Sequence, residues 1–237
     1  MKRVSVAFGI AVLVASAGVA SAAPLGGTFN LAGQAPVRVG PNYIDWGETG
    51  PVFGTPTGDI VFTSADGSFS GLTLTTGTLL DLTNPPALVG APINIANFLT
   101  ADTQPTWDFT LTYIEPGSGT NAGCFDGDSS TNCTPAGSPF TIVDTAGNAS
   151  VTLNMRGTVT DLVGPVSTWS AIYTTQFTGQ SAASLLAAIA NQGYVQSSYS
   201  AEVTSTPPPP TSVPEPLSGF LLGTGLLVAS TVLRRRN

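Results

Sequence analysis

Residues 151–160, with the sequence VTLNMRGTVT, alternate apolar and polar side chains along most of their length. Successive side chains of an extended strand point to opposite faces, so Val151, Leu153 and Met155 would lie together on one face. In a helix the same side chains would be spread around the axis, because the helical repeat is about 3.6 residues. The stretch therefore predicts a strand with one apolar face and one polar face.

The same period of two recurs on both sides of this strand. Two further alternating segments have as their apolar members Trp107, Phe109, Leu111 and Tyr113 in the first, and Trp169, Ala171, Tyr173 and Phe177 in the second. Ile60 and Phe62 begin another strand, and Asp66-Gly67 predicts a hairpin turn before a strand at 69–74. A last strand is expected at 194–204.

Such alternation is typical of antiparallel sheets that face water on one side. We therefore predict a mainly β fold, a single antiparallel β-sandwich with a jelly-roll-like arrangement as its nearest variant. One short helix is expected at 182–192, because Ser181 can cap its start and Gly193 can end it. Its apolar stripe consists of Leu185, Leu186 and Ile189.

The N-terminal segment has the features of a secretory signal peptide. Lys2 and Arg3 precede an uncharged apolar run at 4–20, and the small residues Ala20-Ser21-Ala22 follow. We expect cleavage after Ala22, which makes Ala23 the first residue of the exported protein. The Sec translocation machinery is therefore an expected partner.

The C-terminal segment combines three parts. Val213-Pro214-Glu215-Pro216 follows a proline-rich linker at 206–212, and the next seventeen residues, 217–233, carry no charge. A helix of that length spans about 26 Å, at the short end for crossing a hydrocarbon core. Arg234, Arg235 and Arg236 would remain on the cytoplasmic side and leave everything before 217 outside. The segment thus predicts a single-pass transmembrane helix.

This order of parts at 213–237 resembles the PEP-CTERM sorting signal of Gram-negative bacteria, a Val-Pro-Glu-Pro motif followed by an apolar helix and a basic end. The resemblance implies recognition and cleavage near the motif by an exosortase, and delivery to the cell surface or to a biofilm matrix with extracellular polysaccharide as a partner. The same tail is also catalogued as the C-terminal domain of certain ice-binding proteins. It implies nothing about the activity of the exported domain at 23–205.

Charge and composition exclude several functions. Of the seven basic residues among the 237, the exported part keeps Arg38 and Arg156 against fourteen acids, a net charge of −12. Such a surface repels nucleic acid. The chain has no histidine and no lysine after Lys2, so neither a Ser-His-Asp nor a Ser-Lys arrangement can form.

Two cysteines in an exported chain predict a disulfide between Cys124 and Cys133. Zinc is excluded because no histidine or further cysteine completes a site. Asp126, Asp128 and Ser130 begin like a calcium loop, but the sixth position lacks glycine and the twelfth lacks an acid. We expect no cofactor.

A structural or adhesive surface protein without enzymatic activity is the expected function. A glycan-acting enzyme with paired carboxylates is one alternative, with candidates at Asp45, Glu48, Asp59, Asp102, Asp108 and Glu115. A carbohydrate-binding module is another, for which Trp46 is the tryptophan expected to be exposed; Trp107 and Trp169 are expected in the core. Ice binding is a further alternative, suggested by Thr73, Thr75, Thr76, Thr78 and Thr83.

Overall fold

A computed structural model of the chain describes residues 23–47, 56–125, 132–145, 147–162 and 164–210. The predicted signal peptide with Ala20 and Ala22, the calcium-loop residues, Glu48, the motif at 213–216 and the arginines at 234–236 lie outside these ranges. So does the predicted transmembrane segment at 217–233. Within the described ranges, no helix combines the length and the apolar character needed to cross a membrane.

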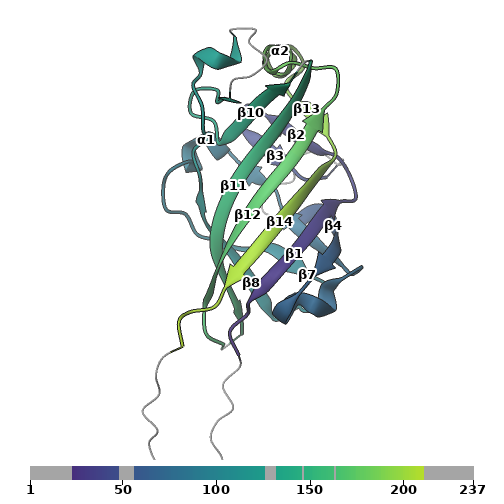
Figure 1. The fold of residues 1–237 in the computed structure, drawn as a ribbon, viewed down its shortest axis with the longest axis vertical. Helices are drawn as coiled ribbons and strands as arrows, with labels where there is room; N and C mark the ends of the chain where they lie inside the picture. Colours follow the sequence, from purple (N-terminus) through teal and green to yellow (C-terminus); the bar gives the residue numbers. More distant parts are fainter. Residues whose placement is uncertain (1–22, 48–55, 126–131, 146, 163, 211–237) are drawn as a thin grey trace, which may run out of the picture.

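Eight antiparallel strands close into a barrel (Figure 1). In order around the barrel they are β12 (Ser167–Phe177), β14 (Tyr199–Thr206), β1 (Gly27–Gly33), β4 (Pro56–Ala65), β5 (Thr76–Leu80), β7 (Ile95–Ala101), β8 (Trp107–Ile114) and β11 (Asn148–Asp161), which pairs back with β12. The prediction of a mainly antiparallel β fold is confirmed. The prediction of a sandwich of two sheets is wrong, because one sheet closes on itself.

Closure depends on β11, which has partners along both edges. One edge pairs with β12 from Ala149↔Phe177 to Val159↔Ser167. The other edge pairs first with β10 (Phe140–Thr145) and then, from Met155 onward, with β8. Because β12 continues to β14 and β8 continues to β7, no strand edge is left open at this seam.

Further elements gather at the upper end of the barrel in Figure 1. Strand β9 (Asn132–Cys133) extends β10, and η2 (Ala122–Cys124) lies beside it. A second sheet has the order β13 (Val195–Ser197), β2 (Val37–Gly40), β3 (Tyr43–Asp45) and β6 (Leu82–Thr83), and is followed by the short helix α1 (Pro85–Leu88). The disulfide between Cys124 and Cys133 is present, as predicted.

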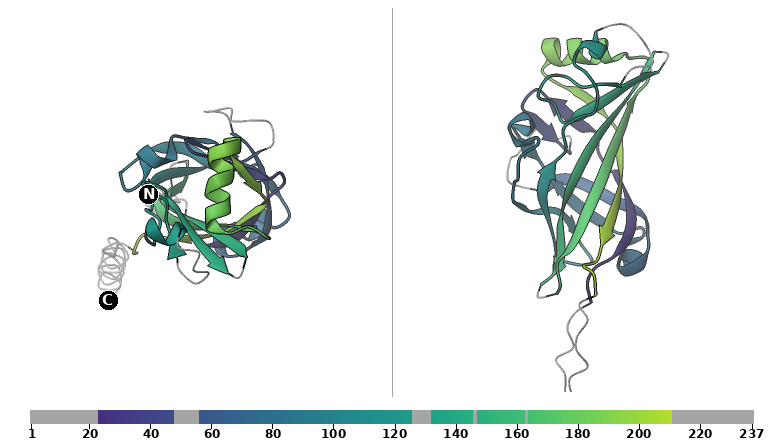
Figure 2. Two further views of the ribbon diagram at one scale, coloured as in Figure 1. Left: turned by 90° about the horizontal axis from the view of Figure 1, so that it is seen from above. Right: turned by 60° about the vertical axis from the view of Figure 1, so that its left-hand side comes forward.

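Helix α2 (Ala182–Gln192) lies across the upper opening of the barrel (Figure 2, left). The Ser181 hydroxyl accepts a hydrogen bond from the Ser184 amide at 3.2 Å. Gly193 ends the helix with a φ of 84°, and its amide donates to the Ile189 carbonyl. The predicted bounds and both capping residues are therefore confirmed.

Two predicted strands differ from the structure. Residues 67–72 form a 3-10 helix, η1 (Gly67–Leu72), in place of a hairpin turn and strand. Phe69 and Leu72 are three positions apart, one turn of such a helix, and both are fully buried. The predicted strand at 194–204 is broken at Ser198, because β13 joins the small sheet while β14 joins the barrel.

Aromatic side chains fill the lower and middle barrel. Phe29 makes edge-on contacts with Phe62, Phe69 and Phe109 at centroid distances of 5.4, 5.0 and 5.8 Å. Trp107 and Trp169 are 8% and 4% exposed, so their predicted place in the core is confirmed. The Trp169 indole donates to the Thr158 carbonyl at 3.0 Å.

Candidate functional site

An apolar cavity of about 290 Å³ lies at the upper end of the barrel, with α2 as one wall. The helix contributes the stripe of Leu185, Leu186 and Ile189 that the sequence predicted. Other elements contribute further aliphatic and aromatic residues: Val37, Val39 and Ile44 from the small sheet, and Phe140, Ile142, Val151, Leu153 and Phe177 from β10 to β12. The walls thus come from segments spread over most of the barrel sequence.

The helix that covers the cavity is fixed at its N-terminal end. The Ala182 amide donates to the Asp144 carboxylate of β10 at 3.0 Å. Ala182 and Leu185 are buried in one cluster with Phe177 and the two cysteines of the disulfide. The disulfide therefore stabilises the region that supports α2, and not the middle of the barrel.

Prolines form part of the cavity walls. Pro41, Pro135 and Pro139 lie in loops, and Pro85 and Pro86 begin α1. A proline ring fixes φ and has no amide hydrogen, so it offers an apolar surface with little backbone freedom. These prolines consequently give the cavity walls of defined shape without adding backbone hydrogen-bond donors to them.

Three aromatic residues line the cavity on the side of the barrel interior. Trp46 lies against Tyr173 and Tyr199, with ring centroids 4.9 and 5.0 Å apart. All three belong to the cluster of buried residues that fills the barrel. Trp46 is 2% exposed, so the expectation of an exposed tryptophan is wrong. Its ring packs within the core cluster, and its backbone amide donates to the Asp81 carboxylate at 2.9 Å.

The side-chain polar atoms of these three residues are buried without a hydrogen bond. Among the described residues, the Trp46 Nε1, Tyr173 Oη and Tyr199 Oη atoms have no partner. An unsatisfied buried polar group destabilises a fold by about 1–3 kcal/mol. Burial raises the pKa of both phenols, and the Asp81 and Asp59 carboxylates raise that of Tyr199 further. Both phenols therefore remain neutral and able to donate a proton to a hydrogen bond.

Two buried carboxylates lie next to the backbone of Trp46: Asp45 precedes it in the chain, and Asp81 accepts a hydrogen bond from its amide. Asp45 is 0% and Asp81 is 3% exposed. Asp45 accepts a hydrogen bond from the Gly47 amide at 3.0 Å, and burial raises its pKa, with a further contribution from Asp81. Sequence reasoning selected Asp45 but missed Asp81. An acid between leucines, in Leu79-Leu80-Asp81-Leu82, was the available signal.

The other predicted carboxylates lie apart from one another. Asp59 is exposed on β4, and Asp102 accepts a hydrogen bond from Thr76. Asp108 accepts one from the Asn97 amide at 3.0 Å. None of these three lines the cavity. The structure therefore does not bring them together into one site.

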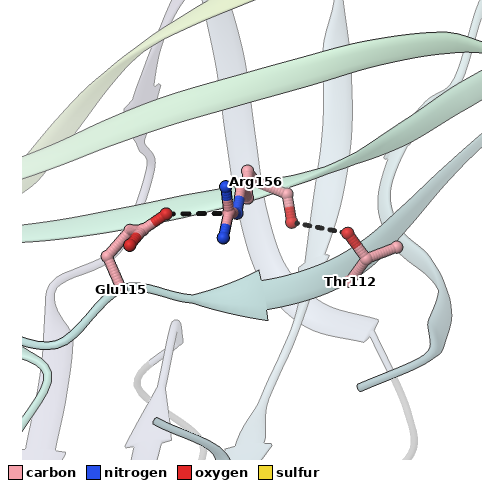
Figure 3. A network of polar contacts seen from close by, with 3 residues as sticks. All are labelled: Thr112, Glu115 and Arg156. Atoms are coloured by element: carbon pink, nitrogen blue, oxygen red, sulfur yellow. Dashed lines mark hydrogen bonds and ion pairs between the residues drawn. The ribbon is translucent and has the colours of Figure 1, made fainter. Parts of the chain in front are cut away.

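Glu115 forms an ion pair with Arg156 at 3.1 Å, and Thr112 donates to the Arg156 carbonyl at 3.3 Å (Figure 3). The Arg156 guanidinium also lies 4.1 Å from the centre of the Tyr113 ring. Because Arg156 and Glu115 are 55% and 37% exposed, this pair is a surface contact of small energetic weight. It gives Glu115 a structural partner on the outer face of the barrel.

The threonines considered for ice binding do not share one face. Thr76 and Thr78 lie on β5, whereas Thr83 lies on β6 in the other sheet. Thr78 hydrogen-bonds with Thr100 of the neighbouring strand at 2.7 Å. Thr73 lies directly after η1.

The cavity has no positive charge in its walls. The described basic side chains are Arg156, on the outer face, and Arg38, which lies over the Tyr194 ring at 5.4 Å and donates to Gln196. Neither lines the cavity. Over the described ranges, no three His, Cys, Asp or Glu residues lie close enough together to hold a metal ion.

Comparison of the chain with protein-family models, curated proteins and solved structures gives no match. What the protein does has to be inferred from the cavity and from the residues around it.

Proposed function

We propose that the barrel is the exported binding domain of a cell-surface protein and holds a small apolar molecule in the cavity beneath α2. The observation that carries this proposal is the cavity itself, about 290 Å³ with walls of aliphatic, aromatic and proline side chains. A closed eight-stranded barrel is just wide enough to hold one small ligand. Pockets that bind small molecules are concave and mostly apolar, with few polar groups.

The volume limits the size of the ligand. An engineered cavity of about 150 Å³ lined by apolar side chains binds benzene. At about 290 Å³, this cavity is roughly twice as large, which suits a bicyclic ring system or a chain of comparable volume. Burial of about 200 Å² of apolar ligand surface would contribute about 5 kcal/mol before the losses of ligand entropy.

The location is part of the proposal. The signal peptide at 1–22 and the motif Val213-Pro214-Glu215-Pro216 favour export followed by exosortase sorting to the surface or matrix. The first residues of β1 and the last of β14 pair, Gly27 with Ser205, at the end of the barrel opposite α2 (Figures 1 and 2). Processing at either end of the chain would therefore leave the cavity undisturbed.

The alternatives receive less support from the geometry. Carbohydrate binding needs accessible aromatic rings, and Trp46 is buried. A paired-carboxylate enzyme needs two acids at one cleft, and of the acids selected for it and described, Asp45 alone is buried. A structural or adhesive role is compatible with the barrel, but it gives no reason for the cavity.

Ligand binding is tested with two matched substitutions. Ile189 lines the cavity, whereas Ile172 is 54% exposed on the outer face. Full-length protein in lipid nanodiscs is titrated with naphthalene by calorimetry, with empty nanodiscs as background. We expect Ile172→Trp to bind like the wild type and Ile189→Trp, which fills the cavity, to bind at least about tenfold more weakly. Equal affinity in all three proteins would refute the proposal.

Sorting is tested separately with Glu215→Ala. The substitution leaves the apolar segment and the arginines unchanged, so membrane insertion should persist. We expect this variant to accumulate uncut in the cytoplasmic membrane while the wild type reaches the surface without its arginines. Mass spectrometry that finds the same C-terminus in both proteins would leave a plain membrane anchor as the explanation.

A further inference from the structure

We infer that a strap formed by residues 186–196, the C-terminal part of α2 with the start of β13, is the movable wall through which a ligand enters the cavity, and that Arg38 is the positioning residue that holds this strap closed. The inference rests on the proposed function, because it concerns access to the same cavity. It adds the route of entry and the side chain that controls it.

The strap is attached less firmly than the first turn of α2. At that turn the Ala182 amide donates to the Asp144 carboxylate at 3.0 Å, and Ala182 is buried. Leu186 and Ile189 of the strap also line the cavity but are only half-buried. Within the described ranges, no hydrogen bond joins residues 186–193 to another element. Segments with few such attachments open locally at the lowest free energy.

Other walls of the cavity are attached more firmly. Strands β11 and β12 are paired along both of their edges. In the loop before β10, the Thr134 amide donates to the Thr120 carbonyl at 3.3 Å. The Ala136 amide of the same loop donates to the Asn121 side chain at 3.1 Å, and the disulfide at Cys133 fixes the start of the loop. Entry through these walls would break barrel pairing or a covalently closed loop, whereas the strap can move by itself.

Arg38 lies on the outside of the strands that join the strap to the small sheet, β13 and β2 (Figure 1). Val37 and Val39 line the cavity, so Arg38 between them points to the opposite face of β2. Its Nε donates to the Gln196 side chain at 3.1 Å, directly opposite in the ladder. Its guanidinium also lies 5.4 Å from the centre of the Tyr194 ring. Arg38 thus clasps the end of the strap from outside.

This clasp acts where the strap closes the cavity. The two residues that Arg38 contacts flank Val195, which lines the cavity. The ladder between β13 and β2 is only three residues long, and β13 is the edge strand of its sheet. The Ser197 hydroxyl marks the end of the strap, because it donates to the Gln176 carbonyl of β12 at 2.9 Å.

Loss of the clasp should change rates and not affinity. Removal of an exposed cation–π contact and a hydrogen bond raises the population of the open strap by about three- to tenfold. The clasp lies on the outer face, so a ligand in the cavity leaves it in place. Entry and exit both require the open strap, and both rates therefore rise by the same factor while Kd stays constant.

The first experiment measures hydrogen exchange on ligand-free, full-length protein in lipid nanodiscs by mass spectrometry. Arg38→Met removes the charge and the donor but keeps an apolar stem. The matched control is Arg156→Met, which removes a guanidinium 4.1 Å from the Tyr113 ring on the outer face of the barrel. We expect the strap amides to exchange about three- to tenfold faster in Arg38→Met and at the wild-type rate in the control. The amides of β11 should be unchanged in both.

The second experiment measures naphthalene association and dissociation by stopped-flow tryptophan fluorescence, since Trp46 lines the cavity. Empty nanodiscs give the background. We expect both rates to rise together in Arg38→Met, with Kd within about twofold of the wild type, and neither to change in Arg156→Met.

The outcomes separate the two proposals. Unchanged exchange of the strap amides, or faster dissociation alone with weaker affinity, would overturn the role of Arg38 and leave the binding function standing. If the wild type does not bind naphthalene, the proposed function fails and the route of entry fails with it. The amide exchange then still decides whether Arg38 holds the strap closed.

Discussion

Replacement of Gly157 by alanine tests the closure of the barrel at its tightest contact. Gly157 lies on β11, where the register with β8 shifts by one residue. A Cβ atom at this position would collide with the Thr110 carbonyl oxygen of β8 and would lie 2.6 Å from the Trp169 ring of β12. The β8 backbone and the Trp169 side chain of β12 therefore approach β11 here at a distance that glycine permits.

The expected loss of stability follows from the neighbours. The Thr110 carbonyl belongs to a paired strand and cannot retreat alone, and Trp169 is 4% exposed and stacked at 6.3 Å on Phe98. Overpacking of this kind costs about 1–3 kcal/mol, and displacement of the indole from the Thr158 carbonyl costs about 1 kcal/mol more. A gain of about 0.4–1 kcal/mol from the stiffer unfolded chain offsets part of this. We expect a net loss of about 1–3.6 kcal/mol, a fall in Tm of about 2–14 °C.

Urea unfolding followed by tryptophan fluorescence measures the effect. The matched control is Gly71→Ala in η1, where a Cβ atom would meet no other atom within 4 Å. The control should change the free energy of unfolding by less than about 0.5 kcal/mol. If Gly157→Ala unfolded at the same urea concentration as the control, the account of barrel closure at this contact would be wrong.

Three further predictions concern stability. Cys133→Ser removes the disulfide to Cys124, nine positions away, and so removes a constraint on the unfolded chain. It should lower the free energy of unfolding by about 2.6 kcal/mol, as measured by urea unfolding. The raised pKa of Tyr173 means that the native phenol stays protonated when the unfolded one, near pH 10, ionises; stability should fall above about pH 10, and less steeply in Tyr173→Phe. Hydrogen bonds from the Thr28 amide and hydroxyl lower the pKa of Asp66, so its contribution should be present above about pH 4 and disappear on acidification; Asp66→Asn should flatten that part of the pH profile.

Elements decided by local chemistry were predictable from the sequence. Helix α2 begins and ends where Ser181 and Gly193 predicted, because both caps act within a single turn. Strands β8, β11 and β12 follow the alternation of their residues. Closure was not predictable, because a sandwich and a barrel place the same alternation on one buried face. The difference lies in which edges of β11 find partners, and that is not a local property.

The cavity could not be predicted from the sequence either, because its walls also depend on contacts between distant segments. The stripe of Leu185, Leu186 and Ile189 identified the buried face of α2, but its partners lie from about 6 to 150 residues away in the chain. Trp46 stands among polar neighbours, which favoured exposure. Its ring packs against Tyr173 and Tyr199, which lie more than 120 positions later in the chain.

The pairing of Gly27 with Ser205 determines how the barrel would respond to mechanical force. A pull that separates the start of β1 from the end of β14 would open their hydrogen bonds one pair at a time, since both strands are loaded from the same end. A pull between the end of β14 and the region of α2 loads β14 along its axis, against β1 and β12 together. Hydrogen bonds perpendicular to the strand then have to yield together. A barrel held by its C-terminal end would thus resist a force applied near α2 far better than a force applied at the start of β1.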